Sequence, residues 1–263
     1  MQNSTQRFTS LTSSQRIYNI SMDDNTNGWA IYVNNDNTQA YLLNTSDAGL
    51  TWSQQQLFTG TSIAYPTVCR VNSTIGYIFL EGGNTIKKTI DGGANFTDQT
   101  LPGNPFIPKI YFFDDQIGWV LGYSGEIYHT SDGGANWVSQ NSGVTTPLKN
   151  AHFISSTEGW VVGNNNVILH TTDGGATWIP QTITTTNVTS INDVHFTSAT
   201  TGYIVGNYLL RGFTTDGGNT WNIEYYDGSS SINEYTAVDF LTPTLGFVLN
   251  VQGFIFKYCP VLK

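Results

Sequence analysis

The sequence predicts an all-β fold, a six-bladed β-propeller of four-stranded antiparallel blades, and three observations lead to it. An eight-residue motif of the form TTDGGATW occurs five times, with its aspartates spaced by 44, 41, 41 and 43 residues. A Gly-aromatic pair followed by a short apolar run occurs six times with the same period. Asn, Thr, Ser and Gly are abundant, whereas charged residues make up only 11% of the chain. A period of this length, built from short strands and polar turns, is typical of propeller blades.

The composition excludes several classes of partner. The net charge is −9 and the pI about 4.6, and an acidic surface repels phosphate backbones, so we predict no nucleic-acid partner. No stretch has the apolar length of a membrane helix, so no membrane span is predicted. The polar start MQNSTQRFTS has no signal-peptide core. We expect a leader to be missing from this sequence and the protein to be extracytoplasmic: secreted, periplasmic or on the cell surface.

The third repeat illustrates the predicted blade. IPKIYF (107–112), GWVLG (118–122) and EIYHT (126–130) are short apolar runs separated by the turns DDQI and YSG. The octet then leads into WVSQ (137–140), the fourth strand. Short runs bounded by turn residues indicate antiparallel strands.

Six units form a single predicted domain over residues 1–263, and their Gly-aromatic pairs begin at Gly28, Gly76, Gly118, Gly159, Gly202 and Gly246. The sixth unit supplies GFVLNVQGFIFKY and ends at CPVLK without an octet. An octet normally ends 22 to 25 residues before the next pair, and Phe8 lies 20 residues before Gly28. Because an open sheet edge exposes unpaired backbone groups, we predict that the N-terminal strand around Phe8 completes the last blade and closes the ring.

The octet is interpreted as a structural turn. Its aspartates are expected to accept hydrogen bonds from backbone N–H groups one to three residues further on, its glycines permit a left-handed backbone, and its final aromatic packs under the turn. These structural aspartates are Asp47, Asp91, Asp132, Asp173 and Asp216. A calcium loop is the alternative, but Ca²⁺ takes six to eight oxygen ligands and the octet has one carboxylate. We therefore predict no metal and no cofactor.

The octet resembles the Asp-box, or BNR repeat. GWVVG…ILHTTDGGATWIPQ (159–181) resembles more specifically the photosystem II stability and assembly factor family of β-propellers, and the chain is more distantly similar to sialidases. The resemblance to the photosystem II stability and assembly factor family covers nearly the whole chain. It implies that the Asp-boxes lie away from the ligand face and that the protein binds a partner polypeptide without chemistry of its own. The arginine-rich patch of that family is not matched, since the arginines are Arg7, Arg16, Arg70 and Arg211.

The sequence bears on three function classes: a glycosidase, a lectin and a protein-binding scaffold. A sialidase needs an arginine triad for its substrate carboxylate, and the four arginines fit no such pattern. Other Asp-box glycosidases use two carboxylates across a cleft, which the sequence leaves open. A lectin would repeat an aromatic residue in its loops, whereas the regular positions of Trp29, Trp119 and Trp160 indicate core packing. We predict a monomeric, non-catalytic binding or scaffold propeller that recognises a protein partner or a surface glycan; the alternatives are a lectin and a glycoside hydrolase.

Variable loops on a rigid scaffold carry function, so the predicted site lies on the loop face opposite the octets. Two segments stand out there, GNYLLRGF (206–213) and EYYDGSSSINEY (224–235). The alternative is a solvated loop with partly packed tyrosines. The predicted ligand-binding residues are Tyr208, Arg211, Tyr225, Tyr226, Asp227, Glu234 and Tyr235.

Two further predictions concern the inner strands and the two cysteines. Seven residues before each Gly-aromatic pair stand Ser21, Cys69, Tyr111, His152, His195 and Asp239. Because they belong to separate blades, we expect them to line or pack near the central channel rather than to converge on a metal, which needs its ligands at one point. The pairing of Cys69 with Cys259 stays open, since a disulfide requires neighbouring Cα atoms.

Overall fold

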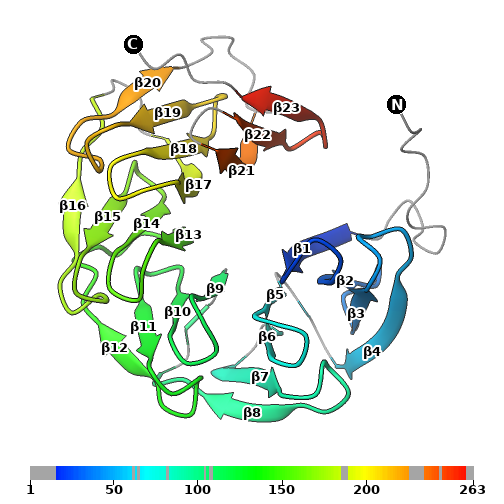
Figure 1. Cartoon of the computed structure of the whole chain (residues 1–263). Helices are drawn as coiled ribbons and strands as arrows, with labels where there is room; N and C mark the ends of the chain where they lie inside the picture. Colours follow the sequence, from blue (N-terminus) through cyan, green and yellow to red (C-terminus); the bar gives the residue numbers. More distant parts are fainter. Residues whose placement is uncertain are drawn as a thin grey trace. The chain divides into compact units, whose positions relative to one another are not determined.

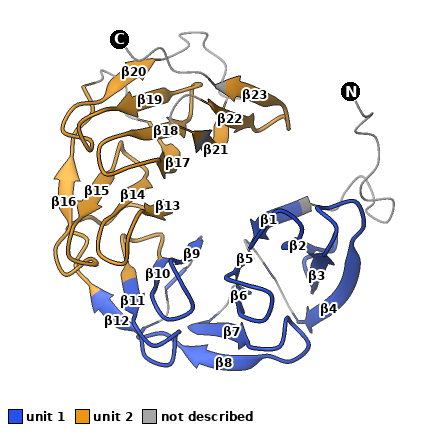
Figure 2. Ribbon diagram, viewed as in Figure 1, with its two compact units in different colours: residues 1–120, 128–139 blue, residues 121–127, 140–263 orange. Residues whose placement is uncertain are grey.

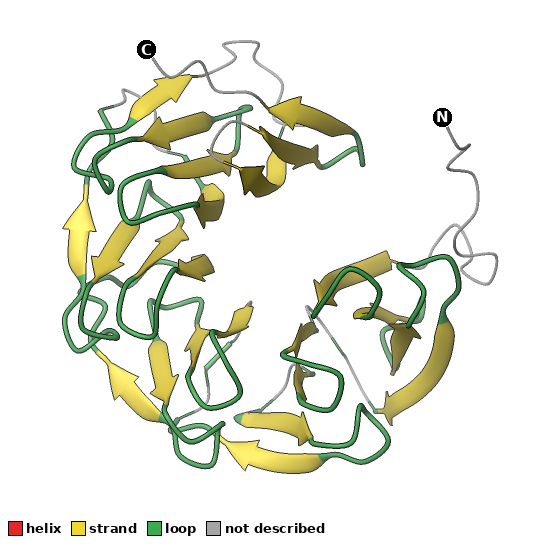
Figure 3. Ribbon diagram, in the orientation of Figure 1, coloured by secondary structure: helices red, strands yellow, loops and turns green. Residues whose placement is uncertain are grey.

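The computed structural model describes residues 16–60, 63, 66–80, 83–103, 105–106, 109–184, 189–224, 234–242 and 245–258. Within these ranges every regular element is a β-strand (Figure 3), which confirms the predicted all-β class. The described part of the chain contains no helix with the length and apolarity of a membrane span.

Six antiparallel sheets contain all the strands of the described residues, and within each sheet the strands pair in the order of the sequence (Figure 1). The first sheet has β1 (Arg16–Met22), β2 (Gly28–Val33), β3 (Gln39–Thr45) and β4 (Ser53–Thr59). The second has β5 (Thr67–Arg70), β6 (Gly76–Phe79), β7 (Thr85–Thr89) and β8 (Thr97–Thr100). The third has β9 (Lys109–Phe112), β10 (Gly118–Leu121), β11 (Ile127–Thr130) and β12 (Val138–Gln140).

The remaining sheets follow the same scheme. The fourth has β13 (Leu148–Phe153), β14 (Gly159–Gly163), β15 (Ile168–Thr171) and β16 (Ile179–Gln181). The fifth has β17 (Ile191–Phe196), β18 (Gly202–Gly206), β19 (Arg211–Thr214) and β20 (Asn222–Glu224). The sixth has three described strands, β21 (Tyr235–Thr242), β22 (Leu245–Asn250) and β23 (Ile255–Tyr258). The blade predicted from the third repeat is therefore confirmed, and the segment around Phe8 lies outside the described residues.

Contacts between residues divide the chain into two compact units (Figure 2). One comprises Met1–Val120 and Tyr128–Ser139, and the other comprises Leu121–Ile127 and Gln140–Lys263. The first unit thus holds the first two sheets and most of the third, and the second unit holds the last three. The single domain expected for residues 1–263 stays a prediction.

The second strand of each of the first five sheets is buried along its whole length, whereas the fourth strand is mostly exposed. Burial on both faces explains why the second strands read as uninterrupted apolar runs such as GWVVG and GYIVG. The core consists of clusters between neighbouring sheets. One of them joins Trp160 and Ile168 to Val194 and Phe196 of the following sheet.

Packing explains both residues of the Gly-aromatic pair: a ring of the same sheet covers the glycine, and the aromatic residue stacks on the following sheet. Phe153 lies opposite Gly159 across the strand pair, and a Cβ on Gly159 would stand 2.2 Å from its ring. Only glycine lets that ring lie flat on the neighbouring strand. The next residue, Trp160, stacks on Phe196 of the following sheet with ring centroids 3.4 Å apart. The same stack occurs between Tyr77 and Phe112 and between Tyr203 and Phe240, and Arg70 takes the place of the phenylalanine over Trp29.

Apolar side chains are exposed on the first sheet, which belongs to the first unit, and on the last sheet, which belongs to the second unit. Ile20 and Met22 on β1 are 54% and 43% exposed, although residues at the equivalent positions of the other five sheets are at most 9% exposed. In the last sheet, Phe247 and Ile255 are 39% and 71% exposed. Their equivalents in the first four sheets are buried, for example Trp160 and Ile168.

Candidate functional site

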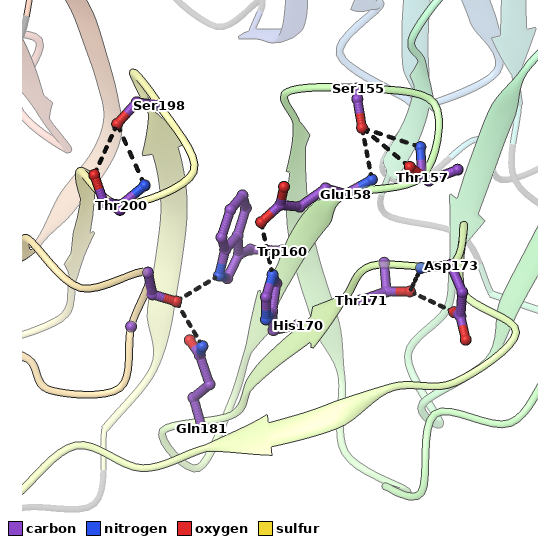
Figure 4. A network of polar contacts seen from close by, with 12 residues as sticks. Ser155, Thr157, Glu158, Trp160, His170, Thr171, Asp173, Gln181, Ser198 and Thr200 are labelled. Atoms are coloured by element: carbon purple, nitrogen blue, oxygen red, sulfur yellow. Dashed lines mark hydrogen bonds and ion pairs between the residues drawn. The ribbon is translucent and has the colours of Figure 1, made fainter.

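The octet from Thr171 to Trp178 joins β15 to β16 and is held by internal hydrogen bonds (Figure 4). The Thr171 hydroxyl donates to Asp173 Oδ1 at 2.9 Å and accepts the N–H groups of Asp173 at 3.3 Å and Gly175 at 2.8 Å. The Asp173 carboxylate accepts the N–H of Thr177 at 2.8 Å and the Thr177 hydroxyl at 2.7 Å. Both carboxylate oxygens are therefore engaged within the loop.

All five octets share this geometry, which corrects one detail of the prediction. The aspartate accepts the N–H of the residue four positions further on, not one to three, so it spans the whole loop instead of a single tight turn. The bond lengths for Asp47, Asp91, Asp132, Asp173 and Asp216 are 2.8–2.9 Å. The glycine two residues after each aspartate has φ between 78° and 98°, as predicted.

Each octet is also tied to the turn between the first and second strands of its own sheet. Gly174 N–H donates to the Thr157 carbonyl at 2.8 Å. The equivalent bonds join Ala48 to Thr26, Gly92 to Thr74, Gly133 to Gln116 and Gly217 to Thr200. The octets and these turns therefore lie at one end of each sheet, and the second-to-third turns lie at the other end.

Hydrogen bonding lowers the pKa of every octet aspartate. The side chain and N–H of Thr177 hold the pKa of Asp173 at about 2, and the N–H and side chain of Asn95 do the same for Asp91. The pKa values of Asp47, Asp132 and Asp216 are lowered by the same kinds of donor. Each carboxylate therefore stays ionised to a lower pH than an ordinary aspartate, because its hydrogen-bond donors favour the charged form.

A link between neighbouring sheets escaped the sequence analysis. Gln140, at the end of β12, donates through Nε2 to the Gly174 carbonyl at 2.8 Å. Gln181, at the end of β16, and the Trp160 indole both donate to the Gly217 carbonyl, at 2.7 and 3.3 Å (Figure 4). The glutamine that ends both WVSQ and WIPQ could have indicated this link. The fourth strands are mostly exposed, so the same final residue in two repeats suggests a shared contact.

At the opposite end of the fifth sheet, the turn between β18 and β19 has an unusual backbone. Tyr208 and Leu209 have φ values of 57° and 54°. The equivalent turn of the fourth sheet uses Asn165 and Asn166 at φ values of 59° and 60°. Asn tolerates this left-handed region, but a bulky side chain there is uncommon and strained. Leu209 packs against a core cluster, whereas Tyr208 remains 42% exposed.

The structure brings part of the predicted site together. Glu234 forms a β-bridge with Asn207, directly before Tyr208. Tyr235 is buried and packs with Tyr203 and Val238, so its ring belongs to the core. Arg211 pairs with Glu224 across the strand pair at 3.1 Å. The predicted site residues Tyr225, Tyr226 and Asp227 lie outside the described residues.

The sequence analysis missed two residues of this edge, Lys149 and Asn192. The ammonium of Lys149 donates to Asn192 Oδ1 at 2.7 Å. Asn192 Nδ2 donates to the Tyr235 carbonyl at 2.8 Å and to Asn207 Oδ1 at 2.9 Å. Burial lowers the pKa of Lys149, and the negative charge of Glu234 opposes that shift. No local motif signals this arrangement, because the partners come from three different repeats.

The inner-strand positions of the second unit pack against one another. The rings of His152 and His195 stack at 4.5 Å, and His195 Nδ1 lies 3.2 Å from Asp239 Oδ1. His152 Nδ1 accepts the Phe196 N–H at 3.1 Å. Among the described residues, no group of three His, Cys, Asp or Glu side chains is arranged to hold a metal ion.

In the first unit, too, a side chain of one inner strand accepts a backbone N–H of the next inner strand. Asn19 Oδ1 accepts the Val68 N–H at 3.2 Å and Ser21 Oγ accepts the Arg70 N–H at 2.8 Å. Side chains of one inner strand thus satisfy backbone donors of the next, as unpaired edge groups require. Burial raises the pKa of Cys69 to about 11. Cys259, with which its pairing was left open, lies outside the described residues.

Comparison with known proteins supports the repeat assignment. A family model described as photosynthesis system II assembly factor YCF48 matches residues 97–187. The structure of YCF48 bound to D1 peptide is 20% identical to this chain, the match covers 95% of each chain, and the TM-score is 0.58. YCF48 from Cyanidioschyzon merolae is 16% identical over 96% of this chain and 98% of its own, with a TM-score of 0.56. No curated protein sequence matches the chain.

The GH74 enzyme of Niastella koreensis gives a TM-score of 0.70 at 18% identity, over 92% of this chain and 44% of the enzyme. Identities this low show a shared fold and nothing about chemistry. Together with the five octets, these matches confirm that the chain is a BNR-repeat protein of propeller type that resembles the photosystem II assembly factor YCF48.

Proposed function

We propose that this chain is a non-catalytic propeller that binds a segment of a partner protein at the loop edge opposite the octets. The turn at Tyr208 carries the proposal. It holds an exposed aromatic ring on a strained backbone where the sibling turn has Asn165, and strain of this kind persists where function requires it. Exposed Tyr residues are among the side chains that most often dominate protein interfaces. The proposed site comprises Tyr208, Arg211 and Glu234, together with the predicted Tyr225, Tyr226 and Asp227.

The YCF48 likeness supports this reading, because one of the similar structures is that of YCF48 bound to D1 peptide. The resemblance to GH74 enzymes is one of fold and supports no hydrolase. Two acidic residues of the fifth sheet already have partners. Glu224 pairs with Arg211, and the buried Asp193 accepts the Val238 N–H at 2.8 Å. A glycosidase needs one carboxylate to carry a proton and the other to act as base or nucleophile.

A peptide-display selection tests the proposal. Peptides enriched on the wild-type protein are measured against Tyr208→Asn, which installs the sibling residue, and against Leu50→Asn, an exposed change on an octet. Loss of an aromatic anchor is expected to weaken binding about tenfold or more for Tyr208→Asn, with Leu50→Asn unchanged. Enriched peptides that bind both variants equally would contradict the proposed site.

We further propose that six blades close into a ring, with the segment around Phe8 as the fourth strand of the last sheet. The exposed apolar faces at Ile20 and Phe247 support this, because equivalent positions elsewhere are buried. Deleting residues 1–14 should lower the melting temperature, and a synthetic peptide of residues 2–15 should restore it. The same peptide with Phe8→Ser should fail to do so. A truncated chain that melts like the full chain would contradict closure.

Extracytoplasmic location and a monomeric state remain proposals from the sequence. Fractionation of the native host tests the first, and sedimentation equilibrium tests the second.

A further inference from the structure

The inner strands of three sheets in the second unit share a bulge at the end nearest the proposed site. The pairing register skips one residue between Leu148 and Asn150 in β13, and one between Ile191 and Asp193 in β17. The skipped residues are Lys149 and Asn192, and β21 skips Thr236 in the same way. A bulge redirects the side chain of the extra residue and is found repeatedly beside functional sites.

The side chains of Lys149 and Asn192, at two of these bulges, are hydrogen-bonded to each other. Asn192 is held in place by its bonds to the Tyr235 carbonyl and to Asn207 Oδ1, so its Oδ1 faces the ammonium of Lys149 in a defined orientation. Asn207 precedes Tyr208 in the strained turn. Two hydrogen bonds therefore connect the partly buried ammonium to the turn that presents the exposed ring.

The charge of Lys149 is incompletely compensated within the part of the chain that the structure describes. Its ammonium has three donors, of which Asn192 takes one. None of the ion pairs between described residues includes Lys149. Glu234 acts on it at longer range and favours its charged form. A cation partly removed from water, with free donors, gains most from an anionic oxygen acceptor.

We propose that the Lys149 ammonium anchors a carboxylate of the partner segment, from an Asp or Glu side chain or a chain end, with Asn192 positioning the ammonium. This inference rests on the proposed function and names the chemistry that the same edge recognises. A carboxylate is favoured over a phosphoryl group because Arg211 already pairs with Glu224, which leaves Lys149 as the one cation of the site outside the ion pairs of the described residues. The protein also has a net charge of −9, which repels more highly charged groups.

The first test observes the ammonium directly in the full chain by ¹⁵N-lysine NMR. N-acetyl-aspartate N-methylamide should shift the Lys149 ammonium signal in a saturable manner, and the acetyl-asparagine analogue should not. The Lys87 signal serves as the internal control, since that ammonium already pairs with Asp98 at 2.8 Å. A Lys149 signal that responds equally to both probes, or to neither, overturns the inference.

The second test uses the display-selected peptides. Replacing their acidic residue by its amide should weaken binding to the wild-type protein about 10- to 100-fold, as expected for a charge-assisted hydrogen bond. The same replacement should change little in Lys149→Met, which keeps the aliphatic stem, whereas Lys149→Arg should retain the dependence. Should Lys149→Met fail to fold, the peptide substitution on the wild-type protein still decides.

The outcomes separate the two proposals. Peptides that depend on Tyr208 but not on Lys149 or on their own carboxylates overturn the anchor and leave the proposed function standing. If no selected peptide depends on Tyr208, both proposals are overturned.

Discussion

Replacing Thr171 with valine tests whether the octet is held by the contacts described above. The substitution keeps the shape of the side chain and removes only the hydroxyl. That hydroxyl donates to Asp173, accepts the Asp173 N–H, and accepts the N–H of the buried Gly175. Valine also suits a strand end such as that of β15, so propensity does not oppose the change.

The magnitude follows from these contacts. The variant leaves the Gly175 N–H without its acceptor inside a buried loop and removes a donor from the Asp173 carboxylate. One unsatisfied buried group together with a lost hydrogen bond lowers the free energy of unfolding by about 2–3 kcal/mol. For a chain of this size the melting temperature should fall by about 5–10 °C.

Thermal unfolding followed by tryptophan fluorescence is a suitable assay, because Trp178 ends the same loop. Thr172→Val is the matched control, since Thr172 is its exposed neighbour and loses the same group. Peptide binding at the opposite edge should be unchanged in both variants. If Thr171→Val melts together with Thr172→Val, or if it keeps its melting temperature and loses binding, the structural interpretation of the octet is refuted.

Three further predictions concern pH, packing and the strained turn. The pKa of Asp173 is about 2 against an ordinary value of 3.8, so its stabilising contribution is complete above about pH 4 and is lost as pH falls toward 2; Asp173→Asn should reduce the dependence of the melting temperature on pH over this range, and the other four octet aspartates should retain theirs. Gly159→Ala drives a methyl group into the Phe153 ring and should destabilise by about 1–3 kcal/mol in urea titrations, whereas Gly83→Ala, with open space around it, should have little effect. Tyr208→Asn should raise the melting temperature by about 2–4 °C, because relief of one bulky left-handed residue is worth about 1 kcal/mol; an unchanged or lower value would argue against strain in this turn.

The sequence by itself determined the strands, their grouping into six sheets and the interior of the octet. These features depend on residues within a few positions of one another, where glycine, a hydroxyl and a carboxylate at fixed spacing allow few backbone solutions. The octet shows the limit of such reasoning, since Asp173 bonds four residues on instead of one to three. Even a local motif leaves the span of its hydrogen bond undecided.

Only the tertiary structure decided which side chains meet between sheets. Lys149 and Asn192 lie 43 residues apart, and so does the pair His152 and His195. Their contacts depend on the bulges and on the stacking of one inner strand beside the next, which composition and periodicity do not encode. Repetition tells us that equivalent positions exist, but the chemistry at the loop edge arises from how unlike residues at those positions face one another across neighbouring sheets.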